Sequence, residues 1–114
     1  MKSLFVLTLL ALNLAGTQAA GYSLKVHNGG SYSGKAYECF SSLPRKSLCC
    51  DWSQTVINDA LSSFRFSTSS NCGVILYKDW KCSGDNLGSS LGSWSKESVS
   101  ATGRQASSAH IYCV

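Results

Sequence analysis

Charged residues and proline are scarce in this sequence of 114 residues. Only 14% of the residues are charged and one is proline. The length excludes a multidomain enzyme, because one domain ordinarily takes about 100 to 150 residues. No apolar run reaches the roughly 20 residues that cross a bilayer as a helix. With 44% hydrophobic residues, the composition also excludes a disordered tail, and we find no basis for a Rossmann or P-loop protein.

The first residues have the pattern of a secretory signal peptide. A basic start at Lys2 precedes an apolar run over 4–12, and small residues follow up to Ala20. This order of a basic, an apolar and a small-residue segment is typical of such peptides. We expect residues 1–19 to be the signal peptide, with cleavage after Ala19 or Ala20. The remaining 20–114 form one domain with a side-chain charge of about +3.

Cysteine is abundant for so short a chain, and all six cysteines follow the expected signal peptide. They are Cys39, Cys49, Cys50, Cys72, Cys82 and Cys113. An even number in a small exported chain predicts three disulfides, which would stabilise a domain too small for a large core. Zinc is the alternative use. It is disfavoured because the sequence has no C-x-x-C and its two histidines lack the spacing of a zinc finger.

Short alternating segments predict an all-β domain. Apolar and polar residues alternate around 24–27, 36–40, 64–66 and 109–113, and 73–77 reads as a buried strand. Between them lie turn signals at 28–30, 33–34, 67–71 and 83–86. The segment 51–60 predicts one short helical turn on which Trp52, Val56 and Ile57 share a face.

The sequence also repeats itself. A shift of 50 residues places 26–34 on 76–84, both with an apolar start and an identical Ser-Gly end. A shift of 45 residues places 58–66 on 103–111, both with Ser-Ser before an alternating strand. The chain therefore reads as two similar units, at about 22–67 and 72–114. Each unit holds three cysteines, so at least one disulfide must join the two units if all six pair within the chain.

These motifs resemble those of the βγ-crystallin family. Leu76-Tyr77-Lys78-Asp79 with Gly84 resembles the aromatic hairpin that opens the family's unit. Asn58-Asp59-Ala60-Leu61-Ser62-Ser63 matches the family's closing pattern at every position. The resemblance implies two Greek keys packed as a sandwich. It also suggests a place in the small, secreted, fungal-type branch of antifungal and killer-toxin-like proteins.

The same resemblance implies a calcium site and a disulfide pattern. In calcium-binding relatives the closing motif supplies oxygen ligands, which here would be the side chains of Asn58, Asp59 and Ser62 and the carbonyl of Ala60. The second unit has Gly103 and Arg104 at the corresponding acidic or amide positions, so at most a partial site is expected. The fold also implies a bridge between Cys72 and Cys113. Cys49 and Cys50 would then pair with Cys39 and Cys82, in either order.

Catalytic residues are not apparent, and we expect a protein that is not an enzyme. A ribonuclease would need a carboxylate base, a histidine acid and a cation at the phosphate. His27, Glu38, Arg65 and His110 occur in a suitable order, but their spacing and the cysteines do not resemble such enzymes. We interpret them as solvated side chains on strands. No cofactor is expected.

Two exposed segments are candidates for contact with a partner. Lys78, Trp80 and Lys81 place an aromatic residue between cations at a hairpin tip, where Trp80 either anchors a partner or covers its own hairpin. The loop 41–47 adds Arg45 and Lys46. The dispersed charge disfavours nucleic acid. Partners would thus be a protein, a carbohydrate or a cell-surface target, and the chain itself is expected to be a secreted monomer.

Three functions fit this sequence. The first is a secreted microbial effector or antifungal toxin that acts by binding. The second is a protease inhibitor, which would present Leu43-Pro44-Arg45 to a protease. The third is an extracellular calcium-binding structural module.

Overall fold

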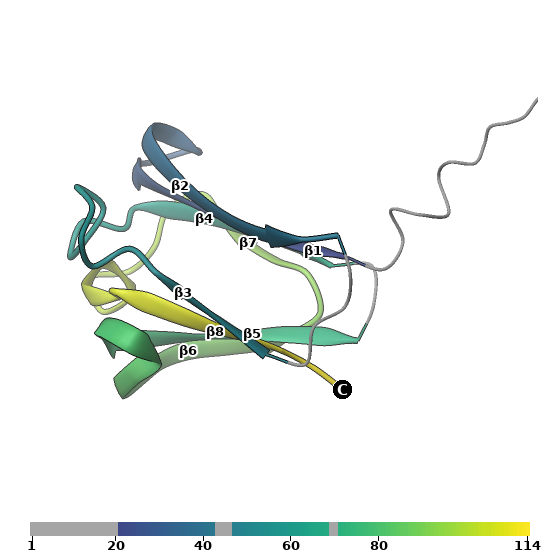
Figure 1. Ribbon diagram of the computed structural model, residues 1–114. Coiled ribbons are helices and arrows are strands. Elements are labelled where there is room, and N and C mark those ends of the chain that lie inside the picture. Colours follow the sequence, from purple (N-terminus) through teal and green to yellow (C-terminus); the bar gives the residue numbers. More distant parts are fainter. Residues whose placement is uncertain (1–20, 43–46, 69–70) are drawn as a thin grey trace, which may run out of the picture.

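Eight strands form two stacked antiparallel sheets in the computed structural model, which describes residues 21–42, 47–68 and 71–114 (Figure 1). The first four strands are β1 (Tyr22–Gly29), β2 (Ser33–Ser41), β3 (Ser47–Asp51) and β4 (Ser63–Thr68). The last four are β5 (Cys72–Asp79), β6 (Ser83–Leu91), β7 (Trp94–Lys96) and β8 (Ser108–Cys113). Two short 3-10 helices, η3 (Trp80–Cys82) and η4 (Gly103–Gln105), complete the described elements. The predicted all-β sandwich is confirmed.

Each sheet takes one strand from the other half of the chain. The strand order is β2-β1-β4-β7 in the first sheet and β3-β8-β5-β6 in the second. The third strand of each four-strand set therefore crosses to the opposite sheet. This exchange makes each Greek key depend on the other for its sheet edge. None of the helices among the described residues has the length and apolarity needed to cross a membrane.

The core lies between the two sheets and is filled by alternate residues of the strands. The first sheet contributes the buried residues Leu24 and Val26 of β1 and Phe64 and Phe66 of β4. The second sheet contributes Val74, Leu76 and Ile111, which are also buried. Trp52 is fully buried after β3, and its Nε1–H donates to the carbonyl of Ala106 at 3.0 Å. The alternation predicted for β1, β4 and β8 thus corresponds to a buried and a solvent-facing side.

The repeated Ser-Ser pair closes the two hairpins in the same way. Ser63 Oγ accepts from the Tyr32 N–H at 2.9 Å and donates to the Gly29 carbonyl at 2.6 Å. Ser108 Oγ accepts from the Cys82 N–H at 2.8 Å and donates to the Asp79 carbonyl at 2.5 Å. Tyr32 and Cys82 both have left-handed backbones, with φ of 60° and 56°. Two hydrogen bonds from a buried serine hold each turn in a conformation that side chains disfavour.

Three disulfides connect the six cysteines. Cys72 pairs with Cys113 between neighbouring strands, as the resemblance implied. Cys50 faces the core and reaches Cys39 on the other sheet, whereas Cys49 faces outward and reaches Cys82 in η3. Adjacent residues of a strand point to opposite sides, which explains why the two neighbours take different partners. The Cys49–Cys82 bridge joins the two halves of the chain.

The segment 51–60 is not the helical turn that the sequence predicted. The N–H groups of Thr55, Asn58 and Ala60 donate to carbonyls three residues earlier, which gives successive turns. Thr55 Oγ1 also donates to the Trp52 carbonyl and accepts from the Ile57 N–H, so it competes with helical hydrogen bonding. Val56 is 65% exposed. The expectation that it shares a buried face with Trp52 was wrong.

Candidate functional site

The connection between β5 and β6 presents a tryptophan and a lysine to solvent. Trp80 is 53% exposed, and the Nζ of Lys81 lies 4.6 Å from the centre of its ring. Lys78 is exposed at the end of β5. We call residues 78–82 the β5–β6 tip. The three tip residues expected to form a contact surface are therefore all at the surface. Arg45 and Lys46, the other expected contact residues, lie outside the described residues, as does the Leu43-Pro44-Arg45 loop.

Three attachments hold this tip to the second sheet. The Cys49–Cys82 disulfide ties it to β3. Asp51 Oδ2, at the end of β3, accepts from the Lys81 N–H at 2.8 Å. Ser108 Oγ, at the start of β8, accepts from the Cys82 N–H at 2.8 Å. A surface aromatic held this firmly loses little conformational entropy when it binds a partner.

Asp51 serves the tip and the following turn together. Its Oδ1 accepts from the Ser53 N–H at 2.8 Å and from the Ser53 hydroxyl at 2.6 Å. Burial alone would raise the pKa of Asp51, but the bonds from Ser53 and the Lys81 N–H, with the charge of Lys81, hold this pKa below its usual value. The carboxylate is thus the ionised form over the whole range near neutral pH. Sequence reasoning missed Asp51, for which the only signal was its place next to Cys50.

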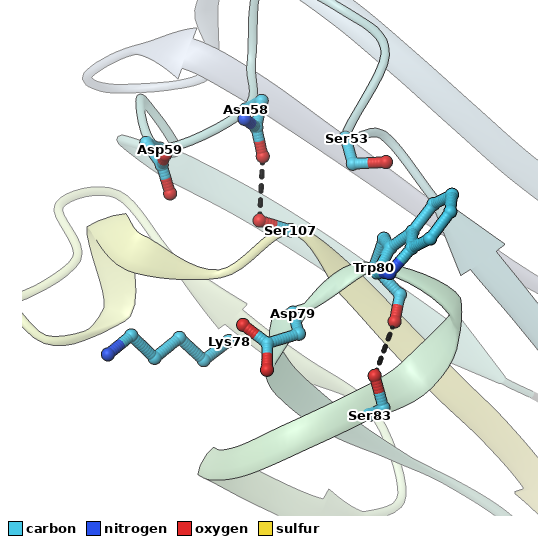
Figure 2. A pocket seen from close by; sticks show the side chains of 8 residues that line it. All are labelled: Ser53, Asn58, Asp59, Lys78, Asp79, Trp80, Ser83 and Ser107. Carbon is cyan, nitrogen blue, oxygen red and sulfur yellow. Dashed lines mark hydrogen bonds between the residues drawn. The ribbon is translucent and has the colours of Figure 1, made fainter.

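A polar cavity of about 410 Å³ lies beside the tip. Figure 2 shows it between the Asn58–Asp59 turn, the end of β5 and the start of β8. Its lining residues are Ser53, Asn58, Asp59, Lys78, Asp79, Trp80, Ser83 and Ser107. Hydroxyl, amide and carboxylate groups therefore share one space with an indole at its edge, and the side chain of Lys78 extends outward from it (Figure 2). Such a set can donate and accept hydrogen bonds to a polar ligand.

The structure divides the four expected calcium ligands between two places. Asn58 and Asp59 line the cavity, where Asn58 Oδ1 accepts from the Ser107 hydroxyl at 2.6 Å (Figure 2). Ser62 does not line this cavity, and its hydroxyl contacts the carbonyls of Asn28 at 3.1 Å and Ala60 at 3.2 Å. The side chains of the first closing motif thus face the serine of the second closing motif. Ser107 was missed because the ligands were taken from one motif alone.

The cavity fits a hard cation in part. The side chains of Asn58, Asp59, Asp79 and Ser107 all carry oxygen, which calcium prefers. Lys78 lines the same space and opposes a cation. Within the described ranges no group of three or more His, Cys, Asp or Glu residues is arranged to hold a metal ion.

Three of the four residues considered for ribonuclease chemistry lie together elsewhere. His27, Glu38 and Arg65 line a second cavity on the outer side of the first sheet. His110 lies on β8 in the second sheet, paired in register with Cys49. The four residues therefore do not form one site, although the first three are neighbours. The interpretation of all four as solvated side chains was wrong for His27, which is only 7% exposed and has the Tyr32 ring beside it at 6.2 Å between ring centres.

Comparisons with known proteins place the fold. No family model matches the sequence, and no curated protein matches it. The N-terminal domain of protein S superposes with a TM-score of 0.52 at 19% identity, covering 81% of this chain and 97% of that chain. A βγ-crystallin domain from Flavobacterium johnsoniae gives 0.51 at 19% identity, with coverages of 79% and 93%. A structure on the evolution of the eye lens βγ-crystallin domain fold gives 0.61 at 14% identity, with coverages of 83% and 89%. At these identities the likeness shows the βγ-crystallin fold alone.

Proposed function

We propose that this protein is secreted and acts without catalysis, by binding a target through the β5–β6 tip, as a microbial effector or antifungal toxin. The observation that carries the proposal is a half-exposed Trp80 on a tip fixed by a disulfide and by hydrogen bonds to Asp51 and Ser108. Tryptophan in a rigid surface position is the residue type that most often dominates binding energy. The polar cavity next to it supplies the hydrogen-bonding groups that give specificity.

Secretion is supported by the amino-terminal pattern and by the disulfides. Disulfides persist in oxidising surroundings and are rare where glutathione keeps thiols reduced. All six cysteines are paired in the structure. Three disulfides give a small fold of this kind durability outside the cell, into which a toxin or effector is released.

Replacing Trp80 tests the proposed contact. We expect Trp80→Ala to weaken binding of the labelled protein to intact fungal or plant cells by at least about tenfold, because anchor residues contribute 2 kcal/mol or more. Depletion of labelled protein from solution measures the binding. Phe40→Ala is the matched control, since Phe40 is 69% exposed on β2 of the other sheet. Equal loss in both variants, or no binding of the wild type to either cell type, would overturn the proposal.

A second candidate function, calcium binding in an extracellular module, is favoured by the oxygen donors around Asn58 and Ser107. We expect weak binding in the range of about 10⁻⁴ to 10⁻³ M that extracellular modules show. Asp59→Ala should abolish the heat of calcium titration in calorimetry. Asp85→Ala, which removes an exposed carboxylate from β6 outside the cavity, should leave the heat unchanged. The absence of heat in the wild type would end this candidate.

A further inference from the structure

The outer side of the first sheet carries a cluster of cations around a buried histidine. Lys25 on β1 is in register with Arg65 on β4 and with Glu38 on β2. These side chains line a cavity of about 300 Å³ together with His27 and Tyr32. Alternation along β1 places Lys25 and His27 on the opposite side from the buried Leu24 and Val26. The cavity therefore lies on the solvent-facing side of the first sheet, opposite the core.

Among the described residues, the two cations of this cavity have no carboxylate partner. Glu38 Oε2 accepts from the Ser23 hydroxyl at 3.1 Å. No ion pair within 4.0 Å joins Glu38 to Lys25 or Arg65 in the part of the chain that the structure describes. Arg65 instead lies over Tyr32, with the guanidinium carbon 4.1 Å from the ring centre. Stacking uses the face of the guanidinium and leaves its N–H groups, which lie in the plane, able to donate to an anion.

His27 adds a buried polar group without a partner. Its side chain is only 7% exposed, and its Nδ1 is buried and has no hydrogen-bond partner within residues 21–42, 47–68 and 71–114. A buried nitrogen without a hydrogen bond destabilises the protein. A bound ligand that forms a hydrogen bond to this nitrogen would remove that cost. This nitrogen belongs to a ring that lines the same cavity as Lys25 and Arg65.

The cluster is not required by the fold. At the corresponding positions of the second half, the shift of 50 residues gives Ile75 for Lys25 and Tyr77 for His27. The shift of 45 residues gives His110 for Arg65. The shift of 50 residues also places Tyr32 on Cys82. Tyr32 lies under the Arg65 guanidinium in the first hairpin turn, whereas Cys82 forms a disulfide with Cys49 in the second. The same fold thus forms without these cations in one half, so their presence in the other half is not explained by the needs of the fold.

We infer that this cavity binds a tetrahedral oxyanion of the phosphate or sulfate type, either free or as an ester on a larger molecule. Arg65 would donate through its fork, Lys25 would supply a second positive charge, and His27 would donate from its ring once protonated. Glu38 also lines the cavity and accepts from the Ser23 hydroxyl, and its negative charge opposes the anion that the two cations attract. This inference does not depend on the β5–β6 tip, which lies on the other sheet.

Protonation of His27 is coupled to such binding. Burial, and then the charges of Lys25 and Arg65, lower the pKa of His27 below its usual value. The groups that face it are Lys25, Tyr32, Glu38 and Arg65, and Glu97 reaches the hairpin only through its carbonyl, which accepts from the Ser31 N–H at 2.8 Å. A bound oxyanion adds negative charge and a hydrogen-bond acceptor, so it should raise the pKa of His27. Binding should therefore strengthen as the pH falls toward that pKa.

The test is an NMR titration of the full disulfide-bonded protein with inorganic phosphate and, separately, with inorganic sulfate. Chloride at equal ionic strength is the reference. We expect saturable displacement of the His27 ring signals and none for His110, which lies on the other sheet. Binding of both anions supports a general oxyanion site, and binding of phosphate alone supports a site selective for the phosphate group. Displacement that grows without saturation, or equally in chloride, would overturn the inference.

Matched variants separate a specific site from general charge. Arg65→Gln should weaken phosphate binding by at least about tenfold, since one lost charge-assisted hydrogen bond contributes about 1.5 to 3 kcal/mol and tenfold corresponds to 1.4 kcal/mol. Arg65→Lys keeps the charge and loses the fork, so it should give an intermediate loss. Lys35→Gln removes an exposed charge from β2 outside the cavity and should have no effect. Lys25→Gln provides a second charge-removing variant within the site. If Arg65→Gln and Lys25→Gln both bind phosphate with the same affinity as Lys35→Gln, the assignment is disproved.

Discussion

Replacing Trp52 by alanine should lower the free energy of unfolding by about 3 to 5 kcal/mol, the range found when a large buried aromatic is removed. Trp52 is fully buried between the sheets. Its backbone N–H donates to the Ser107 carbonyl at 3.0 Å, and its indole N–H donates to the Ala106 carbonyl at 3.0 Å. The residue therefore fills the core from the first half of the chain and bonds to the last turn of the second. Its loss leaves a cavity and an unpaired carbonyl.

Circular dichroism during thermal unfolding measures this effect. For a domain of this size, each kcal/mol lost from the free energy of unfolding lowers the midpoint temperature by about 4 to 8 °C. The midpoint should therefore fall by at least about 12 °C. Trp52→Phe should cost less, because a ring remains and only the indole hydrogen bond and some volume are lost. Trp80→Ala is the matched control, a tryptophan on the surface, and should change the midpoint little. A Trp52→Ala midpoint within a few degrees of the Trp80→Ala midpoint would show that the two halves are not joined through Trp52.

The repeat in the sequence predicted the fold because the repeated residues have the same physical task in both halves. Ser63 and Ser108 each tie a left-handed hairpin turn to a neighbouring strand of the same sheet, β4 or β8. A buried hydroxyl with two backbone partners is difficult to replace, so the Ser-Ser pattern persists in both copies. The strands at 24–27, 64–66, 73–77 and 109–113 were also predictable, since alternating or continuous burial leaves a clear pattern.

Three of the four strands at sheet edges, β3, β6 and β7, left no such pattern. β6 (Ser83–Leu91) is largely exposed and begins where the sequence indicated a turn, because Gly84 at φ 85° serves the bend while the chain already pairs with β5. β7 (Trp94–Lys96) is three residues long and exists because the first sheet offers an open edge at β4. β3 (Ser47–Asp51) likewise pairs with β8 of the other half. Pairing partners of this kind are tertiary, and no local signal specifies them.

The candidate site was predictable only where one segment contained it. The tip residues Lys78, Trp80 and Lys81 follow one another, and the hairpin motif placed them at a turn. The cavity beside them joins Asn58 to Ser107 across 49 residues, and its edges come from both halves. The cluster of Lys25, His27 and Arg65 depends on the register between β1 and β4. Register between strands distant in the chain decides which side chains meet, and it follows from the packing of the whole core.

Removing the Cys49–Cys82 bridge with a double alanine variant should both destabilise the protein and release the β5–β6 tip. The bridge spans 33 residues and the Cys72–Cys113 bridge spans 41. By restricting the unfolded chain, either bridge should stabilise the folded protein by about 4 kcal/mol. Removal of a native disulfide typically lowers the free energy of unfolding by about 2 to 5 kcal/mol. The two deletions should therefore lower stability by similar amounts. Only the first removes a covalent attachment of the tip.

The comparison of these two double variants isolates the contribution of a rigid tip. Hydrogen exchange of the Lys81 and Cys82-position amides, which donate to Asp51 and Ser108, should accelerate in the Cys49→Ala, Cys82→Ala variant. In the Cys72→Ala, Cys113→Ala variant, where both acceptors are intact, exchange at these amides should rise only as far as the loss of global stability accounts for. Cell binding should fall in the first variant and persist in the second, because a mobile Trp80 must be ordered again when it binds. If both variants bind equally well while exchange at the tip differs, rigidity of the tip is not what Trp80 contributes, and its exposed surface alone must supply the affinity.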